Sequence, residues 1–262
     1  MEKIFFLSGL QRSGSTLLTC ILNQNKDIYS TPTSPLFNIL LECGKTIDNC
    51  NNQFTFNKES TSVNVINGII ESYHKDSLKK YVIDKNRGWI HGIDILKQYN
   101  ISPKVICTIR PIPEIISSFI TLIKNSKNQY NIVDKELRLL NKQININNRS
   151  NLIFERIIDV HRKTIIENLE KNKEHIHIIT YDNLVFNTEE TLKSIYNFLD
   201  IPNYNHNFNQ IHNEFIEEKD LEWGFEKLHY VRNNINKESI PPEEVIGKEL
   251  TEYYSQFNIK YS

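Results

Sequence analysis

The chain has 262 residues, of which 39% are hydrophobic and 24% are charged, and its formal net charge is −1. This length and hydrophobic content suffice for a sizeable core, and no composition shift marks a linker, so we expect a single domain over residues 1–262. The nearly balanced charge argues against a nucleic-acid-binding surface, so any anion site must depend on a few placed cations.

The cysteines and the N-terminal residues indicate a compartment. Cys20, Cys43, Cys50 and Cys107 form no Cys-x-x-Cys pair and are typical of reduced, buried small hydrophobes, with a Cys43–Cys50 disulfide as the alternative. The first apolar run is too short for a signal peptide or a membrane helix. We therefore expect a cytoplasmic protein without a membrane span, and we find no cluster of metal ligands.

The N-terminal segment predicts a phosphate-binding loop. Residues 4–7 predict a short buried strand, residues 16–22 predict a helix, and a glycine-bracketed turn lies between them. Glycines let the backbone approach an anion closely, and the free N–H groups of the first helical turn point at it. The candidate anion-binding residues are Gly9, Arg12, Ser13, Gly14, Ser15 and Thr16.

The spacing of Gly9 and Gly14 matches a Walker A loop, but Ser15 stands where that motif has lysine. Walker ATPases and kinases use this lysine on the β- and γ-phosphates, so its absence weakens a nucleoside-triphosphate interpretation. The cation of this loop is Arg12, two positions before Gly14. A glycine turn that binds nothing is the remaining alternative.

Apolar strands alternate with helices along the rest of the chain. Further buried strands are predicted over residues 81–83, 105–109 and 175–180. Helices are predicted over residues 35–43, 60–80, 90–99, 111–125, 132–171 with a break near 145–150, 187–199 and 243–257, and loops over 29–35 and 44–59. The alternation indicates an α/β fold, a three-layer sandwich with helices on both faces of a central parallel sheet.

Polar segments follow several of the predicted strands. They are the loop of residues 9–16, residues 84–87, Arg110 and Tyr181. Because ligands of parallel sheets bind at the carboxyl ends of the strands, we expect these segments to form one site.

Two motifs resemble those of the sulfotransferase family. Residues 12–16, Arg-Ser-Gly-Ser-Thr, resemble its 5′-phosphosulfate loop, and Arg110 with Ser118 eight residues later resembles its 3′-phosphate motif, in which the guanidinium offers a planar fork to phosphate oxygens. Ser117 is the alternative by one position. The resemblance spans roughly residues 3–199. It implies a P-loop-like nucleotide-binding fold and the donor 3′-phosphoadenosine-5′-phosphosulfate (PAPS), with no metal required.

Looser similarities extend the resemblance. Residues 180–185 look like the family's Tyr-Glu-Asp-Leu segment, in which Tyr181 is either a nucleotide contact or an ordinary core aromatic. Residues 223–225 with Arg232 loosely match the late basic loop with which many members close the nucleotide site.

Catalysis, as the resemblance implies it, depends on positioning and on cations. Sulfuryl transfer builds negative charge on the sulfuryl oxygens and on the leaving phosphate, and fixed cations stabilise that charge. Arg12 would hold the 5′-phosphate and its departing charge. Residues 84–87 resemble an acidic-Lys-Ser/Thr-Pro segment of the family, which implies that Lys85 is an electrostatic stabiliser.

The general base does not follow from the family patterns. Residues 31–34 contain no acid, and no histidine stands two positions after Lys85. Our candidate base is His91, which could reach the site from the following helix. The helices of residues 132–171 are expected to help form the wall of the acceptor site.

Two other functions stay open from the sequence. An ATP-dependent small-molecule kinase would use Asp84, at the end of its strand, to bind Mg²⁺. A nucleotide-binding protein without transferase activity is the second. The acceptor of a sulfotransferase could be a carbohydrate, a peptide, a lipid or a small metabolite, and neither the acceptor nor the oligomeric state follows from the sequence.

Overall fold

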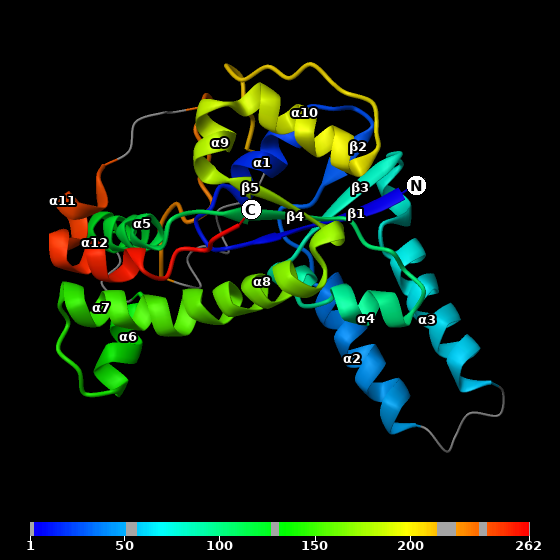
Figure 1. The fold of residues 1–262 in the computed structure, drawn as a ribbon, viewed down its shortest axis with the longest axis horizontal. Helices are drawn as coiled ribbons and strands as arrows, with labels where there is room; N and C mark the ends of the chain where they lie inside the picture. Colours follow the sequence, from blue (N-terminus) through cyan, green and yellow to red (C-terminus); the bar gives the residue numbers. More distant parts are fainter. Residues whose placement is uncertain (1–2, 51–56, 127–130, 214–223, 236–239, 262) are drawn as a thin grey trace.

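Five parallel strands form the central sheet of the computed structural model (Figure 1), which describes residues 3–50, 57–126, 131–213, 224–235 and 240–261. The strands are β1 (Lys3–Gly9), β2 (Ile28–Ser30), β3 (Tyr81–Lys85), β4 (Val105–Ile109) and β5 (Ile176–Thr180). Their order across the sheet is β2-β3-β1-β4-β5, and each neighbouring pair is parallel. All five carboxyl ends therefore lie at one edge.

Helices cover both faces of this sheet (Figure 1). They are α1 (Ser15–Leu22), α2 (Leu36–Asn49), α3 (Lys58–Tyr73), α4 (Ile93–Gln98), α5 (Ile112–Asn125), α6 (Ile132–Leu139), α7 (Ile146–Leu152), α8 (Asp159–Lys171), α9 (Tyr181–Phe186), α10 (Thr188–Leu199), α11 (Pro242–Ile246) and α12 (Lys248–Ser255). Shorter 3₁₀ turns are η2 (Lys75–Ser77), η3 (Arg87–Ile90) and η5 (Lys173–His175), and η4 (Ile153–Ile158) is π-helical. The predicted three-layer sandwich with a parallel sheet is confirmed.

Two buried cores lie on the two faces of the sheet. Because successive strand residues point to opposite faces, Phe6 packs into the core that includes α5 and α8, while Leu7 packs into the core beneath α1, α9 and α10. The same alternation places Asp84 and Lys85, neighbours at the end of β3, on opposite faces of the sheet.

Several predicted boundaries were wrong. Strand β2 was predicted as loop, because it has only three residues, and Tyr29 between its buried ends is exposed. Helix α2 continues to Asn49 instead of ending near residue 43, and Ile47 in its last turn is buried. The helical region after residue 131 breaks at residues 140–145, before the predicted break, and the last helix is divided at Gly247, whose φ is +86°. Helix α9 was not predicted.

The four thiols are free, with Cys20 and Cys107 buried and Cys43 and Cys50 half-buried, so the disulfide alternative is wrong. Within the described ranges, no helix combines the length and the apolar character that crossing a bilayer requires.

Candidate functional site at the carboxyl edge of the sheet

The loop between β1 and α1 depends on close backbone approach. Gly9 has a φ of +139°, and a Cβ at this position would lie 2.2 Å from the carbonyl oxygen of Thr108 in β4. Gly14 has a φ of +90°, and a Cβ there would meet the Tyr181 ring at 3.0 Å. Arg12 also adopts a left-handed conformation, with a φ of +57°. These three residues shape the turn that leads into α1.

The N-terminus of α1 carries no side-chain cap. Gly14 occupies the cap position, and the first intrahelical bond runs from the N–H of Leu18 to the carbonyl oxygen of Gly14. The N–H groups of the first helical turn, residues 15–17, therefore have no intrahelical partner and are available to an anion. The helix dipole also favours negative charge at this end. Ser15 and Thr16, in this turn, are half-buried.

Ser13 supports the loop from below. Its hydroxyl donates to the carbonyl oxygen of Leu10 at 2.5 Å and shares a hydrogen bond with the hydroxyl of Thr108 at 2.7 Å. Because the Ser13 side chain is buried in these contacts, it ties the loop to β4. Because the hydroxyl of Ser13 already has these partners, we expect this residue to contact a ligand through its backbone.

Arg12 joins the loop to two distant segments. Its Nε donates to the hydroxyl of Ser118 in α5 at 3.1 Å, and its Nη1 donates to the carbonyl oxygen of Leu228. The structure thus brings the two predicted motifs, residues 12–16 and 110–118, into direct contact. Ser118 contacts Arg12, whereas Ser117, the alternative by one position, is buried on the core side of α5. Trp223, in the late segment singled out from the sequence, lies outside the described residues.

Arg110 stacks on the aromatic ring that borders Gly14. Its guanidinium carbon lies 4.0 Å from the centroid of the Tyr181 ring. Its Nε donates to Glu114 Oε2 at 2.9 Å, and its Nη1 donates to the carbonyl oxygen of Arg12 at 3.2 Å. Arg110, Tyr181 and the loop therefore form one contact group.

Lys85 reaches the same loop from β3. Its Nζ donates to the hydroxyl of Thr16 at 3.0 Å, and its backbone N–H donates to the hydroxyl of Thr31 at 2.8 Å. Burial, reinforced by the charge of Arg87, lowers the pKa of Lys85 to about 7. The amine is thus poised to change charge near neutral pH when an anion binds beside it.

Asp84 faces away from the loop. It is fully buried, its Oδ2 lies 2.6 Å from His74 Nε2, and its Oδ1 accepts a hydrogen bond from the indole N–H of Trp89 at 2.7 Å. It pairs in register with Phe6, whereas Lys85 pairs with Leu7 on the other face. This placement opposes the Mg²⁺ role that the kinase alternative requires of Asp84.

The structure places His91 apart from these residues. It follows η3, and the residue is exposed. Among the described residues, no hydrogen bond or ion pair joins His91 to the loop of residues 9–16. A base role for His91 stays a prediction.

A second histidine, which the sequence did not single out, lies at this edge. His161 in the first turn of α8 lines a pocket of about 310 Å³ together with Thr33, Asn86 and Arg87. Asn86 is the chain neighbour of Lys85. No short motif identifies His161, because only the packing of α8 brings it to Thr33, Asn86 and Arg87, which lie far earlier in the chain.

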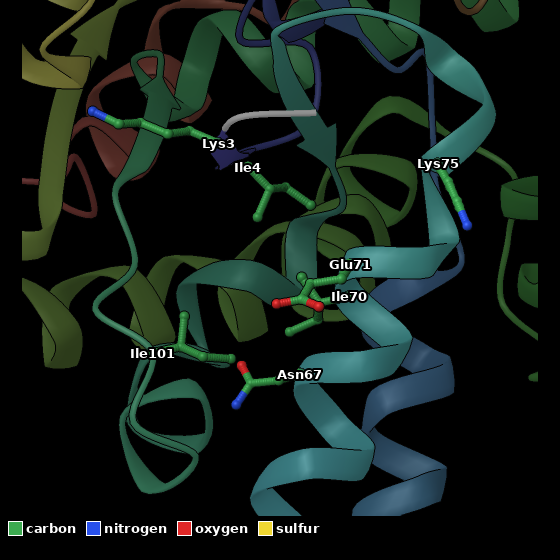
Figure 2. Close-up of a pocket in the computed structure, with 7 residues that line it drawn as sticks. All are labelled: Lys3, Ile4, Asn67, Ile70, Glu71, Lys75 and Ile101. Atoms are coloured by element: carbon green, nitrogen blue, oxygen red, sulfur yellow. The ribbon is translucent and has the colours of Figure 1, made fainter.

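Another pocket, of about 400 Å³, lies at the opposite edge. Figure 2 shows Ile4 of β1, Ile70 of α3 and Ile101 pointing into it. Since Lys3 and Ile4 are the first two residues of β1, this pocket lies at the amino end of that strand, away from the loop. In the part of the chain that the structure describes, no group of three or more His, Cys, Asp or Glu side chains could hold a metal ion.

Comparisons with known proteins place the chain in a family. A family model described as the sulfotransferase family matches residues 5–206, well over half of the chain, whereas a search of curated protein sequences finds no match.

Solved structures share the fold at low sequence identity. The sulfotransferase domain from the curacin biosynthetic pathway is 17% identical, with a TM-score of 0.59 over 97% of this chain and 96% of that one. The sulfotransferase domain from the Synechococcus PCC 7002 olefin synthase is 17% identical, with a TM-score of 0.54 over 97% and 94%. A sulfotransferase from Alicyclobacillus acidocaldarius is 13% identical, with a TM-score of 0.51 over 98% and 92%. With the family model matched over most of its length, the chain belongs to the sulfotransferase family.

Proposed function

We propose that the protein transfers a sulfuryl group from PAPS to a hydroxyl or amine of an acceptor. The observation that carries the proposal is the hydrogen bond from Arg12 to Ser118, because it joins the two segments that would hold the two phosphate groups of one nucleotide. The protein would act in the cytoplasm, on a carbohydrate, peptide, lipid or small-metabolite acceptor.

The residues present fit a nucleotide that is phosphorylated at two positions. The uncapped N-terminus of α1 and the Arg12 guanidinium suit the 5′-phosphate. Arg110 and Ser118 suit the 3′-phosphate, since a guanidinium fork and a hydroxyl converge there. The Tyr181 ring, between Gly14 and Arg110, would border the nucleotide. PAPS supplies the sulfuryl group and the phosphate leaving group, and needs no metal from the protein.

Lys85 and Arg12 would stabilise the charge that develops during transfer. Lys85 already contacts Thr16 of the loop, and Arg12 of the loop already contacts Ser118, so little reorganisation of these cations is needed at the moment of reaction. A negative phosphate beside Lys85 would raise its pKa from about 7, so the amine would carry its positive charge when the donor is bound.

The experiment that tests the proposal is a thermal shift of the purified protein with adenosine 3′,5′-bisphosphate (PAP), ADP and ATP–Mg²⁺ in parallel. A ligand at ~100 times its dissociation constant adds about 2.7 kcal/mol of stability. We expect PAP to stabilise the protein without metal, and to do so more than ADP, which lacks the 3′-phosphate. Stabilisation by ATP–Mg²⁺ with no response to PAP would overturn the proposal in favour of a kinase.

A further inference from the structure

The carboxyl edge of the sheet is divided between two groups of strands. The segments after β1, β4 and β5 contribute the loop, Arg110 and Tyr181, which contact one another. The segments after β2 and β3, together with His161 of α8, form the pocket of about 310 Å³. Strand β1 lies next to β3 in the sheet, so the pocket and the proposed nucleotide site are neighbours.

Direct contacts connect the pocket to the loop side. Lys85 donates to Thr16 in α1, and the next residue, Asn86, donates to the carbonyl oxygen of Ser34 at 2.6 Å and to Asn38 Oδ1 at 3.1 Å. The hydroxyl of Ser8 in β1 donates to the carbonyl oxygen of Arg87 at 2.7 Å. The pocket therefore adjoins the end of β3, the strand that carries Lys85.

The pocket holds a cation that the protein does not neutralise. Arg87 is exposed, and among the described residues its guanidinium makes no hydrogen bond or ion pair. Arg110 differs, because Glu114 accepts its hydrogen bond. The amide side chains of Asn38 and Asn86 add polar groups to the wall. An unpaired guanidinium with polar neighbours is suited to a carboxylate, phosphate or sulfate group of a ligand.

The pocket also holds an imidazole without a partner. His161 makes no hydrogen bond or ion pair among the described residues and is half-buried. Burial, reinforced by the charge of Arg87, lowers its pKa, so the ring is neutral at pH 7 and can accept a proton.

The other charged groups near the start of α8 already have partners or solvent. On its own helix, Asp159 pairs with Arg162 and Lys163 at 2.6 and 2.7 Å. In η4, Arg156 pairs with Glu136, and Glu155 is exposed. The π-helical segment η4 ends just before Asp159, the first residue of α8.

We propose that this pocket binds the acceptor of the transfer, that Arg87 binds an anionic group of that acceptor, and that His161 takes the proton of its hydroxyl. This inference rests on the function proposed above. The acceptor oxygen forms a bond to the sulfuryl sulfur, and the bond from sulfur to the 5′-phosphate oxygen breaks. That oxygen keeps the electron pair, and the hydroxyl proton passes to the imidazole nitrogen. The acceptor class is thus a hydroxylated carboxylate or phosphate ester.

The test uses matched pairs of small hydroxyl compounds that differ in one charge: 3-hydroxybutyrate against 1,3-butanediol, and glycerol 3-phosphate against glycerol. Binding to the PAP-loaded protein is measured by ligand-observed NMR, and sulfated product formed with PAPS is measured by mass spectrometry. The variants are Arg87→Leu, Arg87→Lys and His161→Gln. Arg156→Leu is the matched control, because this arginine lies on the neighbouring π-helical segment and is mostly exposed.

We expect the wild-type protein to bind and sulfate the anionic member of a pair on the order of tenfold better than the neutral member. Arg87→Leu should abolish this preference, Arg87→Lys should retain part of it, and Arg156→Leu should leave it unchanged. His161→Gln should keep the binding preference but lower kcat by roughly 10²- to 10⁴-fold on both members.

Several results would overturn the inference. They are the absence of any preference for the anionic members, a preference that survives Arg87→Leu, binding without transfer in the wild type, or an unchanged kcat in His161→Gln. A separate PAP titration of the wild type distinguishes the two proposals. If PAP does not bind, the proposed function fails, whereas PAP binding without an anionic preference defeats only the acceptor assignment.

Discussion

The two sides of the carboxyl edge differ in how their charged side chains are partnered. On the proposed nucleotide side, after β1, β4 and β5, Arg12 is bonded to Ser118 and Arg110 to Glu114. On the proposed acceptor side, which the segments after β2 and β3 form with His161 of α8, Arg87 and His161 make no such bonds among the described residues. Both sides contain arginine, so they differ in whether neighbouring side chains already bind its guanidinium group.

This contrast fits the two tasks that a group transfer sets. A site for a fixed donor benefits from side chains held in place before binding, because less freedom is lost when the ligand arrives. A site for the second substrate needs cations and bases whose hydrogen-bonding capacity is still available. Lys85 lies between the two sides, since it donates to Thr16 and adjoins Asn86 of the pocket.

The largest effect on stability should come from a substitution at Gly9, where β1 ends and the loop of residues 9–16 begins. Gly9→Ala places a Cβ 2.2 Å from the Thr108 carbonyl oxygen at a φ of +139°, so we expect a loss of about 2–5 kcal/mol in the free energy of unfolding. Chemical denaturation measures it. Gly68→Ala is the control, because nothing lies within 4 Å of its added Cβ in α3, and it should be neutral or slightly stabilising. Equal stability of both variants would contradict the close approach of β1 and β4.

Removing either arginine of the nucleotide side should weaken PAP binding. Arg12→Ala and Arg110→Ala each lose charge-assisted contacts of about 1.5–3 kcal/mol, roughly 10- to 150-fold in Kd by calorimetry. Arg87→Ala should leave the Kd for PAP nearly unchanged. If Arg87→Ala weakens PAP as strongly as Arg110→Ala does, the edge is not divided in the way proposed here.

Lys85 should link PAP binding to pH. With a pKa of about 7, its amine is mostly neutral at pH 8, and a bound phosphate that raises this pKa makes binding take up as much as about one proton. The uptake should vanish near pH 6, where the amine is already protonated, and PAP affinity should fall as pH rises above 7. Calorimetry in buffers of different ionisation enthalpy measures the uptake. Lys85→Met removes this amine and should abolish its contribution, whereas an unchanged uptake would assign the proton to another group.

The same lysine should lower the stability of the unliganded protein. Its folded-state pKa of about 7 lies below the ordinary value of 10.5, so the unfolded chain binds more protons between pH 7 and 10.5, and stability rises with pH across that window. Lys85→Met should therefore be more stable than the wild type at pH 6, by roughly 2–4 kcal/mol, with the difference shrinking toward pH 10. A difference that does not change with pH would contradict the lowered pKa.

The smallest effect should come from the tyrosine hydroxyl. Arg110 and Gly14 contact the ring of Tyr181, so Tyr181→Phe keeps both contacts and should change PAP affinity by less than about 0.5 kcal/mol. Tyr181→Leu loses the cation–π contact with Arg110, so it should weaken the free energy of PAP binding by about 0.5–2 kcal/mol. A large loss in Tyr181→Phe would instead place the hydroxyl on the nucleotide.

Local patterns in the sequence predicted segments that the structure brings together on the proposed nucleotide side, but they did not single out the pocket of the proposed acceptor side. The glycine turn and the Arg110-to-Ser118 spacing are short-range signals, and the structure brings these segments into contact. The position of His161 depends on long-range packing of α8 against η3, for which no short motif exists. The burial of Asp84 was equally hard to predict from a local pattern. Its partners are His74, at the end of α3, and Trp89, in η3, and these two elements lie on either side of β3 in the chain.

The most direct measurement is a crystal structure of the protein with PAP bound. We predict the 5′-phosphate at the N-terminus of α1 beside Arg12, the 3′-phosphate on Arg110 and Ser118, and the pocket of Arg87 and His161 still open to an acceptor. A nucleotide whose phosphates lie on Arg87, in the pocket after β2 and β3, would contradict the division of this edge into a donor side and an acceptor side.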